Sequence, residues 1–468
     1  MKALIVAAGI GRRLGNMTKD RPKPLTKLLG LSLIERIILT AKQAGIKEFI
    51  IVVGYLGNRI KSELGDGKEL GVKIEYVENK EYEKENGISV LKAKNFLNEK
   101  FILLMSDHVF DVRILNSLIY FNSNKSIVIA VDRRPPSAED TRVLEKNGDV
   151  AAIGKNLKDS NCVDTGIFLC FPKIFSYIEQ AVNDGNTTLS DGISMAIKEK
   201  DVSVFDITTI QSYESKMRKH VKPWWIDIDT VDDLREARKI IIENASKNPS
   251  DALAAYVHKP IENKLVGIIS NFKITPNQLT VLVNILAYSV TALYFSGHLL
   301  TGIILAFIVG IADGLDGKLA RVKLKTSKVG TLEHSFDMLF EFSWLIALAW
   351  YLFRATHSTL PLFCSLFSIV FITFYRHVYD QFRKAAGRSL DDSGDFERKF
   401  RRIAGRRNLY NIPILIGILL IPLYSLNGPI YSLVFILFHS MVTAVVYAAR
   451  AIKHLREGDS EKEKGNRE

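Results

Sequence analysis

Two aspartates, Asp313 and Asp316, stand three residues apart at the end of a long apolar stretch. On a helix, this spacing puts both carboxylates on one face. Ionisable groups at the edge of a membrane segment cost free energy, and they usually face a bundle interior, where they hold metal, substrate or protons. The pair therefore predicts a site for metal, substrate or protons at a membrane boundary, with a transporter ion site or simple pairing to Lys318 or Arg321 as alternatives.

A second candidate site stands at the other end of the chain. A short apolar run leads into Gly9 and Gly11, with Arg13 just beyond. Glycines after a buried strand let backbone N–H groups approach a phosphate closely, and an arginine adds positive charge. A dinucleotide-binding loop is the alternative, but its G-x-G-x-x-G spacing fails because residue 14 is leucine.

The elements that carry this glycine turn belong to a half that alternates short apolar runs with charged ones. The expected strands are Ala3–Ala8, Phe49–Val53, Lys73–Tyr76, Phe101–Met105 and Ser126–Val131, with helices such as Ser32–Ala44 between them and Asp229–Ala245 at the end. Such alternation is typical of an α/β sheet covered on both faces. The first apolar run is too short for a signal sequence and lacks a cleavage site, so we expect a buried strand.

The second half consists mainly of apolar segments, which are candidate membrane helices. They are Leu279–Phe295, Leu299–Ala312, Met338–Phe353, Leu360–Phe374, Leu409–Leu423 and Ile430–Ala449. Lys and Arg are concentrated in the loops at 318–328, 376–407 and 453–468, whereas the alternate loops carry few charges. Because basic loops stay in the cytoplasm, we expect six crossings of the cell membrane with the soluble half and both termini cytoplasmic.

These patterns divide the chain into four parts. A soluble domain at 1–245 is followed by a linker and juxtamembrane amphipathic helix at 246–275, an all-α membrane domain of six helices at 276–452 and a basic polar tail at 453–468. The net charge of +12 suits anionic lipid and cytoplasmic loops better than nucleic acid, so no nucleic-acid partner is expected. The three cysteines lack metal-binding spacing and are expected to be reduced.

Three further motifs accompany the glycine turn. They are Pro22-Lys23-Pro24-Leu25, an aspartate at 107 after the apolar run 101–105, and Trp225-Ile226-Asp227 near the end of the soluble half. In this combination and order, the soluble half resembles the nucleotidyltransferases that activate sugar or alcohol phosphates with a nucleoside triphosphate. The resemblance implies an α/β, Rossmann-like mixed sheet.

The resemblance also implies roles for individual residues. Nucleotide-binding residues would be Ala8, Gly9, Gly11, Arg13, Lys23 and Asn86, with Arg13 and Lys23 also catalytic. Asp107 and Asp227 would bind Mg²⁺, or Mn²⁺, which bridges the oxygens that gain charge as pyrophosphate leaves. Lys155, Thr165 and Gly166 would hold the substrate phosphate. Helix capping and turn formation are the alternative roles for the two aspartates.

The run from Asp313 continues as Gly317, Ala320 and Arg321, and eight residues separate Arg321 from Gly330. It resembles the opening of the CDP-alcohol phosphotransferase signature, D-x-x-D-G-x-x-A-R followed by G-x-x-x-D-x-x-x-D. Strict register would require aspartates at positions held by His334 and Met338, whereas the acids lie one residue earlier. Those acids are Glu333 and Asp337, which keep the separation of four that shares a helix face, and Glu341 extends it.

By this resemblance, Asp313, Asp316, Glu333 and Asp337 would bind metal, with His334 as an alternative ligand at the third position. Asp337 would also act as general base on the acceptor hydroxyl. Asn277, Thr280, Gly317 and Arg321 would contact the substrate, although helix capping is an equal alternative for the first two. Arg383 or Arg388 in the basic loop could receive an anionic acceptor.

The two halves together make and consume a nucleotide-activated alcohol. This pairing resembles the bifunctional inositol-1-phosphate cytidylyltransferase and di-myo-inositol-phosphate phosphate synthase family. It implies CTP, inositol 1-phosphate and CDP-inositol as substrates and intermediate, the lipid bilayer as surroundings, and a homodimer through the membrane domain. The alternatives are a phospholipid synthase that uses a CDP-alcohol and a non-catalytic transporter or scaffold with a nucleotide-binding domain.

Overall fold

The computed structural model describes residues 1–11, 20–210, 222–246, 253–325 and 333–465, without the side chains of 333–335 and 458–465. The chain divides into two compact units, and the boundary between them falls after Ile241. The predicted Arg13 and the side chains of the predicted Glu333 and His334 lie outside the described residues.

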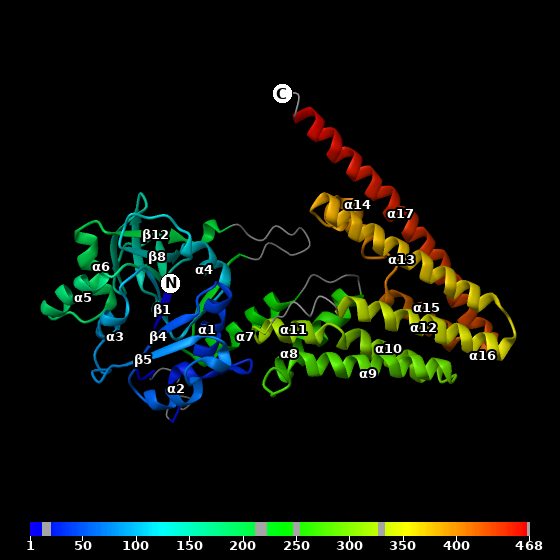
Figure 1. Cartoon of the computed structure of the whole chain (residues 1–468), viewed down its shortest axis with the longest axis horizontal. Helices are drawn as coiled ribbons and strands as arrows, with labels where there is room; N and C mark the ends of the chain where they lie inside the picture. Colours follow the sequence, from blue (N-terminus) through cyan, green and yellow to red (C-terminus); the bar gives the residue numbers. More distant parts are fainter. Residues whose placement is uncertain (12–19, 211–221, 247–252, 326–332, 466–468) are drawn as a thin grey trace. The chain divides into compact units, whose positions relative to one another are not determined.

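The first unit is built on a mixed sheet of nine strands (Figure 1). In sheet order they are β5 (Lys73–Glu78), β4 (Glu48–Val53), β1 (Lys2–Ala7), β6 (Phe101–Met105), β11 (Cys162–Cys170), β8 (Ile127–Asp132), β12 (Val202–Asp206), β10 (Asp149–Gly154) and β9 (Arg142–Lys146). The strands from β5 to β6 are parallel, and β11 runs antiparallel to β6 and β8. Two small ribbons, β2 (Lys27–Leu28) with β3 (Leu31–Ser32) and β7 (His108–Phe110) with β13 (Trp225–Asp227), complete the unit.

Helices cover both faces of the sheet, as the alternating pattern predicted. Along β1, Ala3 and Ile5 pack with α1 (Leu33–Gln43), α2 (Gly57–Leu64) and α4 (Val112–Ile119), whereas Leu4 and Val6 pack with α3 (Asn86–Lys92), α5 (Ile174–Asn183) and α6 (Leu189–Lys198). Successive side chains of a strand point to opposite faces, so β1 is apolar throughout. The expected strands and helices of this half are all present, and α7 (Val231–Ala245) crosses the boundary between the units.

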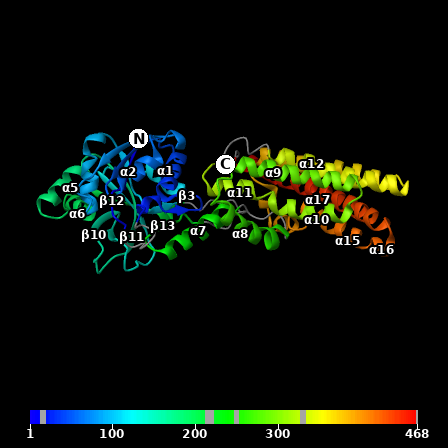
Figure 2. The same cartoon turned by 90° about the horizontal axis from the view of Figure 1, so that it is seen from below.

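The second unit consists of helices. They are α8 (Lys259–Ile269), preceded by a π-helical turn at Ala254–His258, then α9 (Pro276–Phe295), α10 (Leu299–Ala312), α11 (Leu315–Val322), α12 (Glu333–Thr356), α13 (Leu360–Ala386), α14 (Asp395–Phe400), α15 (Arg407–Leu419), α16 (Ile421–Tyr424) and α17 (Asn427–Gly465). The long helices form a closed ring of neighbours: α9 packs on α10, α10 on α15, α15 on α17, α17 on α13, α13 on α12, and α12 on α9 (Figures 1 and 2).

Five helical stretches are long and apolar enough to cross a membrane, among the residues that the structure describes. They are Pro276–Phe295, Leu299–Val322, Phe336–Thr356, Leu360–Ala386 and Asn427–Glu457. The sixth expected segment, Leu409–Leu423, is divided between α15 and α16, because the helix is interrupted at Leu420 just before Pro422. The last helix continues to Gly465, through most of the stretch that the sequence assigned to a polar tail.

Candidate active sites

Strand pairing brings together the predicted metal ligands of the first unit. Asp107 follows β6, and β7 begins at the next residue, His108. In the antiparallel ribbon of β7 and β13, Asp227 lies directly opposite His108. Side chains of directly opposed residues project from the same face of a ribbon. The ribbon thus joins residues that are more than a hundred positions apart in the sequence.

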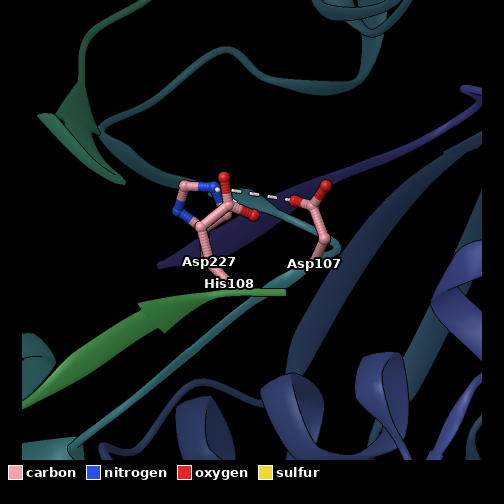
Figure 3. Close-up of side chains that lie close together, drawn as sticks. All are labelled: Asp107, His108 and Asp227. Carbon is pink, nitrogen blue, oxygen red and sulfur yellow. Dashed lines mark ion pairs between the residues drawn. The ribbon is translucent and has the colours of Figure 1, made fainter. Parts of the chain in front are cut away.

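These three side chains form a compact group of donor atoms. One ligand atom each from Asp107, His108 and Asp227 lies within 4.8 Å of the others (Figure 3). His108 Nε2 is 3.7 Å from Asp107 Oδ1 and 3.4 Å from Asp227 Oδ1. The Oδ1 atom of Asp227 is buried and has no hydrogen bond. A buried carboxylate oxygen without a partner costs free energy, so the donor set fits a divalent cation.

Lys23 is the cation beside this group. It lies in a 3₁₀ turn at Lys23–Leu25, and its Nζ is 2.7 Å from both Asp107 Oδ2 and Asp229 Oδ1. Its side chain is only 8% exposed. Burial opposes the charged form, but the surrounding carboxylates outweigh burial and raise the pKa of Lys23, which stays protonated. Gly11 has φ +64° and approaches so closely that a Cβ there would lie 2.6 Å from Lys23 Cβ.

The ring of His108 is fixed by its other neighbours. Its Nδ1 lies 2.7 Å from the carbonyl oxygen of Thr165, and its ring stacks on Trp225 with centroids 5.8 Å apart. Gly166 has φ +71°, and a Cβ there would lie 2.2 Å from Nδ1. Burial opposes a charge on this ring, but Asp227 and Asp107 outweigh it and raise the pKa of His108 to about 10.

The remaining predicted residues of the first unit differ in their surroundings. Gly9 is exposed, and Ala8 is buried with its carbonyl accepting from Tyr55 N. Asn86 accepts a hydrogen bond from the backbone of Leu189 at 2.9 Å, which ties α3 to α6. Lys155 is exposed in the turn after β10. The contacts of Asn86 are those of a structural tie between helices.

The side chain of Thr165 does not support its predicted role as a substrate ligand. It is fully buried, and its hydroxyl donates to the carbonyl of Ala130 at 2.7 Å. A hydroxyl engaged in the sheet interior has no donor left for a phosphate. Thr165 and Gly166 instead form the surface against which His108 packs.

In the second unit, Asp313 and Asp316 have separate partners. Asp313 Oδ2 lies 2.6 Å from an Nη atom of Arg407, the first residue of α15. Arg407 also packs over the rings of Phe340 and Trp344, at 4.6 and 5.8 Å from their centroids. The ion pair and the cation–π contacts together hold the guanidinium between Asp313 and the two aromatic rings of α12.

Asp316 is 4% exposed and accepts hydrogen bonds from its own helix and from α9. Gly317 N donates to Asp316 Oδ1, and the Thr280 hydroxyl donates to Asp316 Oδ2. Thr280 therefore lies at the predicted site, whereas Asn277 is exposed at the start of α9. These two hydrogen bonds orient the Asp316 carboxylate.

The other predicted residues of this site lie on α11 and α12. Arg321 Nε donates to the carbonyl of Ala245 at 2.6 Å, and a Cβ at Gly317 would lie 3.3 Å from an Nη of Arg321. Asp337 is half-buried on α12. Among the described side chains, Asp313, Asp316 and Asp337 do not form a three-ligand group. The reason is that Asp313 turns toward Arg407 and Asp316 toward Thr280.

Three residues at these sites were not predicted from sequence. Asp229 stands two residues after Asp227 in the same motif, and His108 directly follows Asp107, so position beside a predicted ligand was the available signal. Arg407 belongs to the basic loop from which Arg383 and Arg388 were chosen, and both of those are exposed. Arg407 could be told apart from the other arginines of this loop only in the folded protein, where α15 packs against α10.

Comparison with known proteins matches both halves of the chain. A nucleotidyl transferase family model matches residues 2–244, and a CDP-alcohol phosphatidyltransferase model matches residues 273–449.

Relatives match most of the chain. "Bifunctional IPC transferase and DIPP synthase" of Aquifex aeolicus is 31% identical over 87% of this chain and 89% of its own length. The protein of that name from Archaeoglobus fulgidus is 30% identical over 95% of this chain and 84% of its own. Among solved structures, the inositol-1-phosphate CTP transferase from T. maritima aligns with 50% of this chain and 90% of its own, at 27% identity and a TM-score of 0.42.

Proposed function

The chain belongs to the family of bifunctional IPC transferases and DIPP synthases, and we propose that it catalyses both reactions. The first unit joins CTP and inositol 1-phosphate to give CDP-inositol and pyrophosphate. The second transfers phosphoinositol from CDP-inositol to another inositol 1-phosphate and releases CMP. The observation that carries this proposal is the likeness to relatives over most of the chain, with a nucleotidyl transferase match followed by a CDP-alcohol phosphatidyltransferase match.

In the first reaction, a phosphate oxygen of inositol 1-phosphate attacks the α-phosphorus of CTP, and the bond to the β-phosphate oxygen breaks. We assign to Lys23 the neutralisation of charge on the attacked phosphate, because Asp107 and Asp229 hold its ammonium group in place. Mg²⁺ or Mn²⁺, when bound at Asp107 and Asp227, supplies charge neutralisation at the leaving pyrophosphate. Gly9, Gly11 and Arg13 bind the triphosphate in this proposal.

In the second reaction, a hydroxyl of the acceptor attacks the phosphorus that carries inositol, and CMP leaves. We assign the acceptance of the hydroxyl proton to Asp337. Asp313 and Asp316, with Glu333 or His334, would hold a divalent cation, which would supply charge neutralisation at the diphosphate. The helical spacing of Asp313 and Asp316 supports this assignment, whereas their contacts with Arg407 and Thr280 give each carboxylate a protein partner of its own.

We propose six membrane crossings, with α15 and α16 forming the fifth. Residues 407–424 would extend over about 27 Å at about 1.5 Å per residue, close to the thickness of the hydrocarbon core. The contacts of α15 with both α10 and α17 support a place for it in the helix ring. The basic loops support cytoplasmic termini, a cytoplasmic first unit and the four-part division of the chain. A homodimer through the membrane domain is proposed from family resemblance alone.

Product identification with the purified full-length protein tests this function. We expect CTP, Mg²⁺ and labelled inositol 1-phosphate to yield pyrophosphate, CDP-inositol, CMP and a water-soluble labelled phosphodiester, which mass spectrometry identifies. Label that enters the organic phase only when lipid substrates are added would establish a phospholipid synthase instead. Complete lack of turnover, with nucleotide bound, would favour a transporter or scaffold.

A further inference from the structure

We propose that His108 Nε2 is a third protein ligand of the divalent cation at Asp107 and Asp227, and that this nitrogen gives the site a preference for Mn²⁺ over Mg²⁺. The inference rests on the proposed function, which places a cation at the two aspartates. It extends that function to a residue that the motif comparison did not mark.

The spacing of the donor atoms fits a shared cation. Two ligands at about 2.1 Å from one ion lie about 3 Å apart at a right angle and about 4.2 Å apart on opposite sides. The distances from His108 Nε2 to the nearest oxygens of Asp227 and Asp107 are 3.4 and 3.7 Å. Both fall between these limits, so His108 Nε2 is placed to share a cation with either carboxylate, and the three donor atoms all lie within 4.8 Å of one another.

The hydrogen bond on the far side of the ring selects the tautomer that binds metal. A carbonyl oxygen only accepts, so the 2.7 Å contact with Thr165 requires the proton on His108 Nδ1. In the neutral ring, Nε2 then carries the lone pair, and this is the atom that faces the carboxylates. Metal-binding histidines commonly use such a contact to a backbone carbonyl to fix the ring.

The packing around the ring leaves it little freedom to turn away. The side chain is 14% exposed and stacks on Trp225. Gly166 also lies against the ring, in space that a Cβ would fill. A donor held in place before the ion arrives loses little conformational entropy on binding.

Asp227 supplies a further observation, at the same oxygen atom that lies 3.4 Å from His108 Nε2. Its Oδ1 is buried without a hydrogen bond, although the neighbouring Asp107 Oδ2 is engaged by Lys23. An oxygen in this condition gains most from an incoming cation. Three donor groups therefore lie close together: Asp227 Oδ1, which has no hydrogen bond, the carboxylate of Asp107, and His108 Nε2.

A nitrogen donor changes which ion is preferred. Mg²⁺ favours oxygen ligands and retains several waters, whereas imidazole is a good ligand for transition metals. Replacement of one water by His108 Nε2 therefore stabilises Mn²⁺ more than Mg²⁺. The alternative is a protonated His108 that takes no part in metal binding and pairs with the two carboxylates itself.

The decisive measurement is pulsed electron paramagnetic resonance of Mn²⁺, the probe ion, bound to the full-length protein. The second site is first disabled by combining Asp313→Asn with Asp316→Asn, so that only the first site holds the ion. We expect nuclear modulation from a directly bound ¹⁴N nucleus. Bound Mn²⁺ without this modulation overturns the proposal, and this result needs no change at His108.

Substitution then identifies the nitrogen. In the same background, we expect His108→Gln to abolish the ¹⁴N modulation and to weaken Mn²⁺ binding about 10- to 100-fold, with a smaller effect on Mg²⁺. The matched control, His377→Gln, changes an exposed histidine outside both sites and is expected to leave the modulation unchanged. Modulation that persists in His108→Gln would overturn the assignment to this residue.

Asp227→Asn separates this inference from the proposed function. If Asp227→Asn removes Mn²⁺ binding while wild-type protein shows no nitrogen coupling, the metal site stands and the role of His108 is wrong. If Mn²⁺ does not bind at Asp107 and Asp227 at all, the metal assignment of the proposed function fails as well. CDP-inositol formation, measured separately, reports on the reaction itself.

Discussion

The two candidate sites hold their aspartates in different ways. In the α/β unit, Asp107 and Asp227 converge with His108 on one point. In the helical unit, Asp313 pairs with Arg407, and Asp316 accepts from Thr280. A ribbon of two strands places directly opposed side chains close together. In the helical unit, by contrast, Asp313 contacts α15 and Asp316 contacts α9.

The difference recurs away from the two sites. In the helical unit, Glu341 pairs with Arg376, and Asp391 lies 3.3 Å from Arg401. These two buried carboxylates each lie beside an arginine, because isolated buried charge is costly. The α/β site instead places one lysine, Lys23, between two acids and leaves an oxygen of Asp227 unsatisfied.

The largest effect that we predict is from Lys23→Met. Loss of the ammonium group should lower CDP-inositol formation about 10³-fold, because it acts directly on the charge of the attacked phosphate. Release of pyrophosphate measures this rate, and Lys27→Met, which removes an exposed lysine nearby, is the matched control. Synthesis of the phosphodiester from added CDP-inositol should be unchanged. A parallel loss of both reactions would contradict the separation of the two sites.

Asp316→Asn is the corresponding change in the helical unit. It removes the charge and leaves one acceptor oxygen for the hydrogen bonds from Thr280 and Gly317, and we expect CDP-inositol consumption to fall about 10²- to 10³-fold. Release of CMP from added CDP-inositol is the measurement. Asp395→Asn, at a carboxylate whose side chain is 84% exposed, is the control. Undiminished CMP release would show that Asp316 is only a structural acceptor.

The strands and helices of the first unit were predicted well because short stretches of sequence are enough to specify them. Buried strands need apolar residues on both faces, and β6 was predicted with its observed bounds, Phe101–Met105. The membrane segments followed from hydropathy, but the sequence did not reveal that Leu409–Leu423 divides into two helices. Pro422 lacks the backbone N–H that a continuous helix would use, but hydropathy alone does not register this break.

The sites were predictable only where a motif marked them. The spacing of Asp313 and Asp316 is local and therefore visible in the sequence, whereas the partner of Asp313 lies on α15. The position of His108 opposite Asp227 depends on the register of β7 with β13, which no local sequence pattern specifies. The burial of Thr165 likewise depends on β11 lying at the centre of the sheet.

Arg407→Lys tests whether the charge beside Asp313 is enough to position this carboxylate, and we expect a smaller effect than for Asp316→Asn. Lysine keeps the charge beside Asp313 but loses the planar contact with Phe340 and Trp344. We expect CMP release to fall about tenfold and CDP-inositol formation to stay unchanged. Arg407→Met, which removes the charge as well, should reduce CMP release further. Equal rates in Arg407→Lys and wild type would show that charge alone positions Asp313.

The smallest effect concerns Glu397, a carboxylate of the helical unit outside the two sites. Its side chain is 1% exposed, lies 2.9 Å from His454 Nε2 and also pairs with Arg450. Burial disfavours its charge, but the hydrogen bonds from Arg450 and His454 prevail and lower the pKa of Glu397 to about 2. Glu397→Gln should reduce the free energy of unfolding by about 1–3 kcal/mol at neutral pH and leave both reactions intact.

The sign of the pH dependence follows from the lowered pKa of Glu397. The unfolded chain takes up the proton near pH 4.5, whereas the folded chain does so only near pH 2. The stabilisation is therefore complete above pH 4.5 and is lost as the pH falls toward 2. Thermal unfolding in detergent should show wild type and Glu397→Gln converging over this range. A constant difference in melting temperature would mean that packing, rather than the ion pair, links α14 to α17.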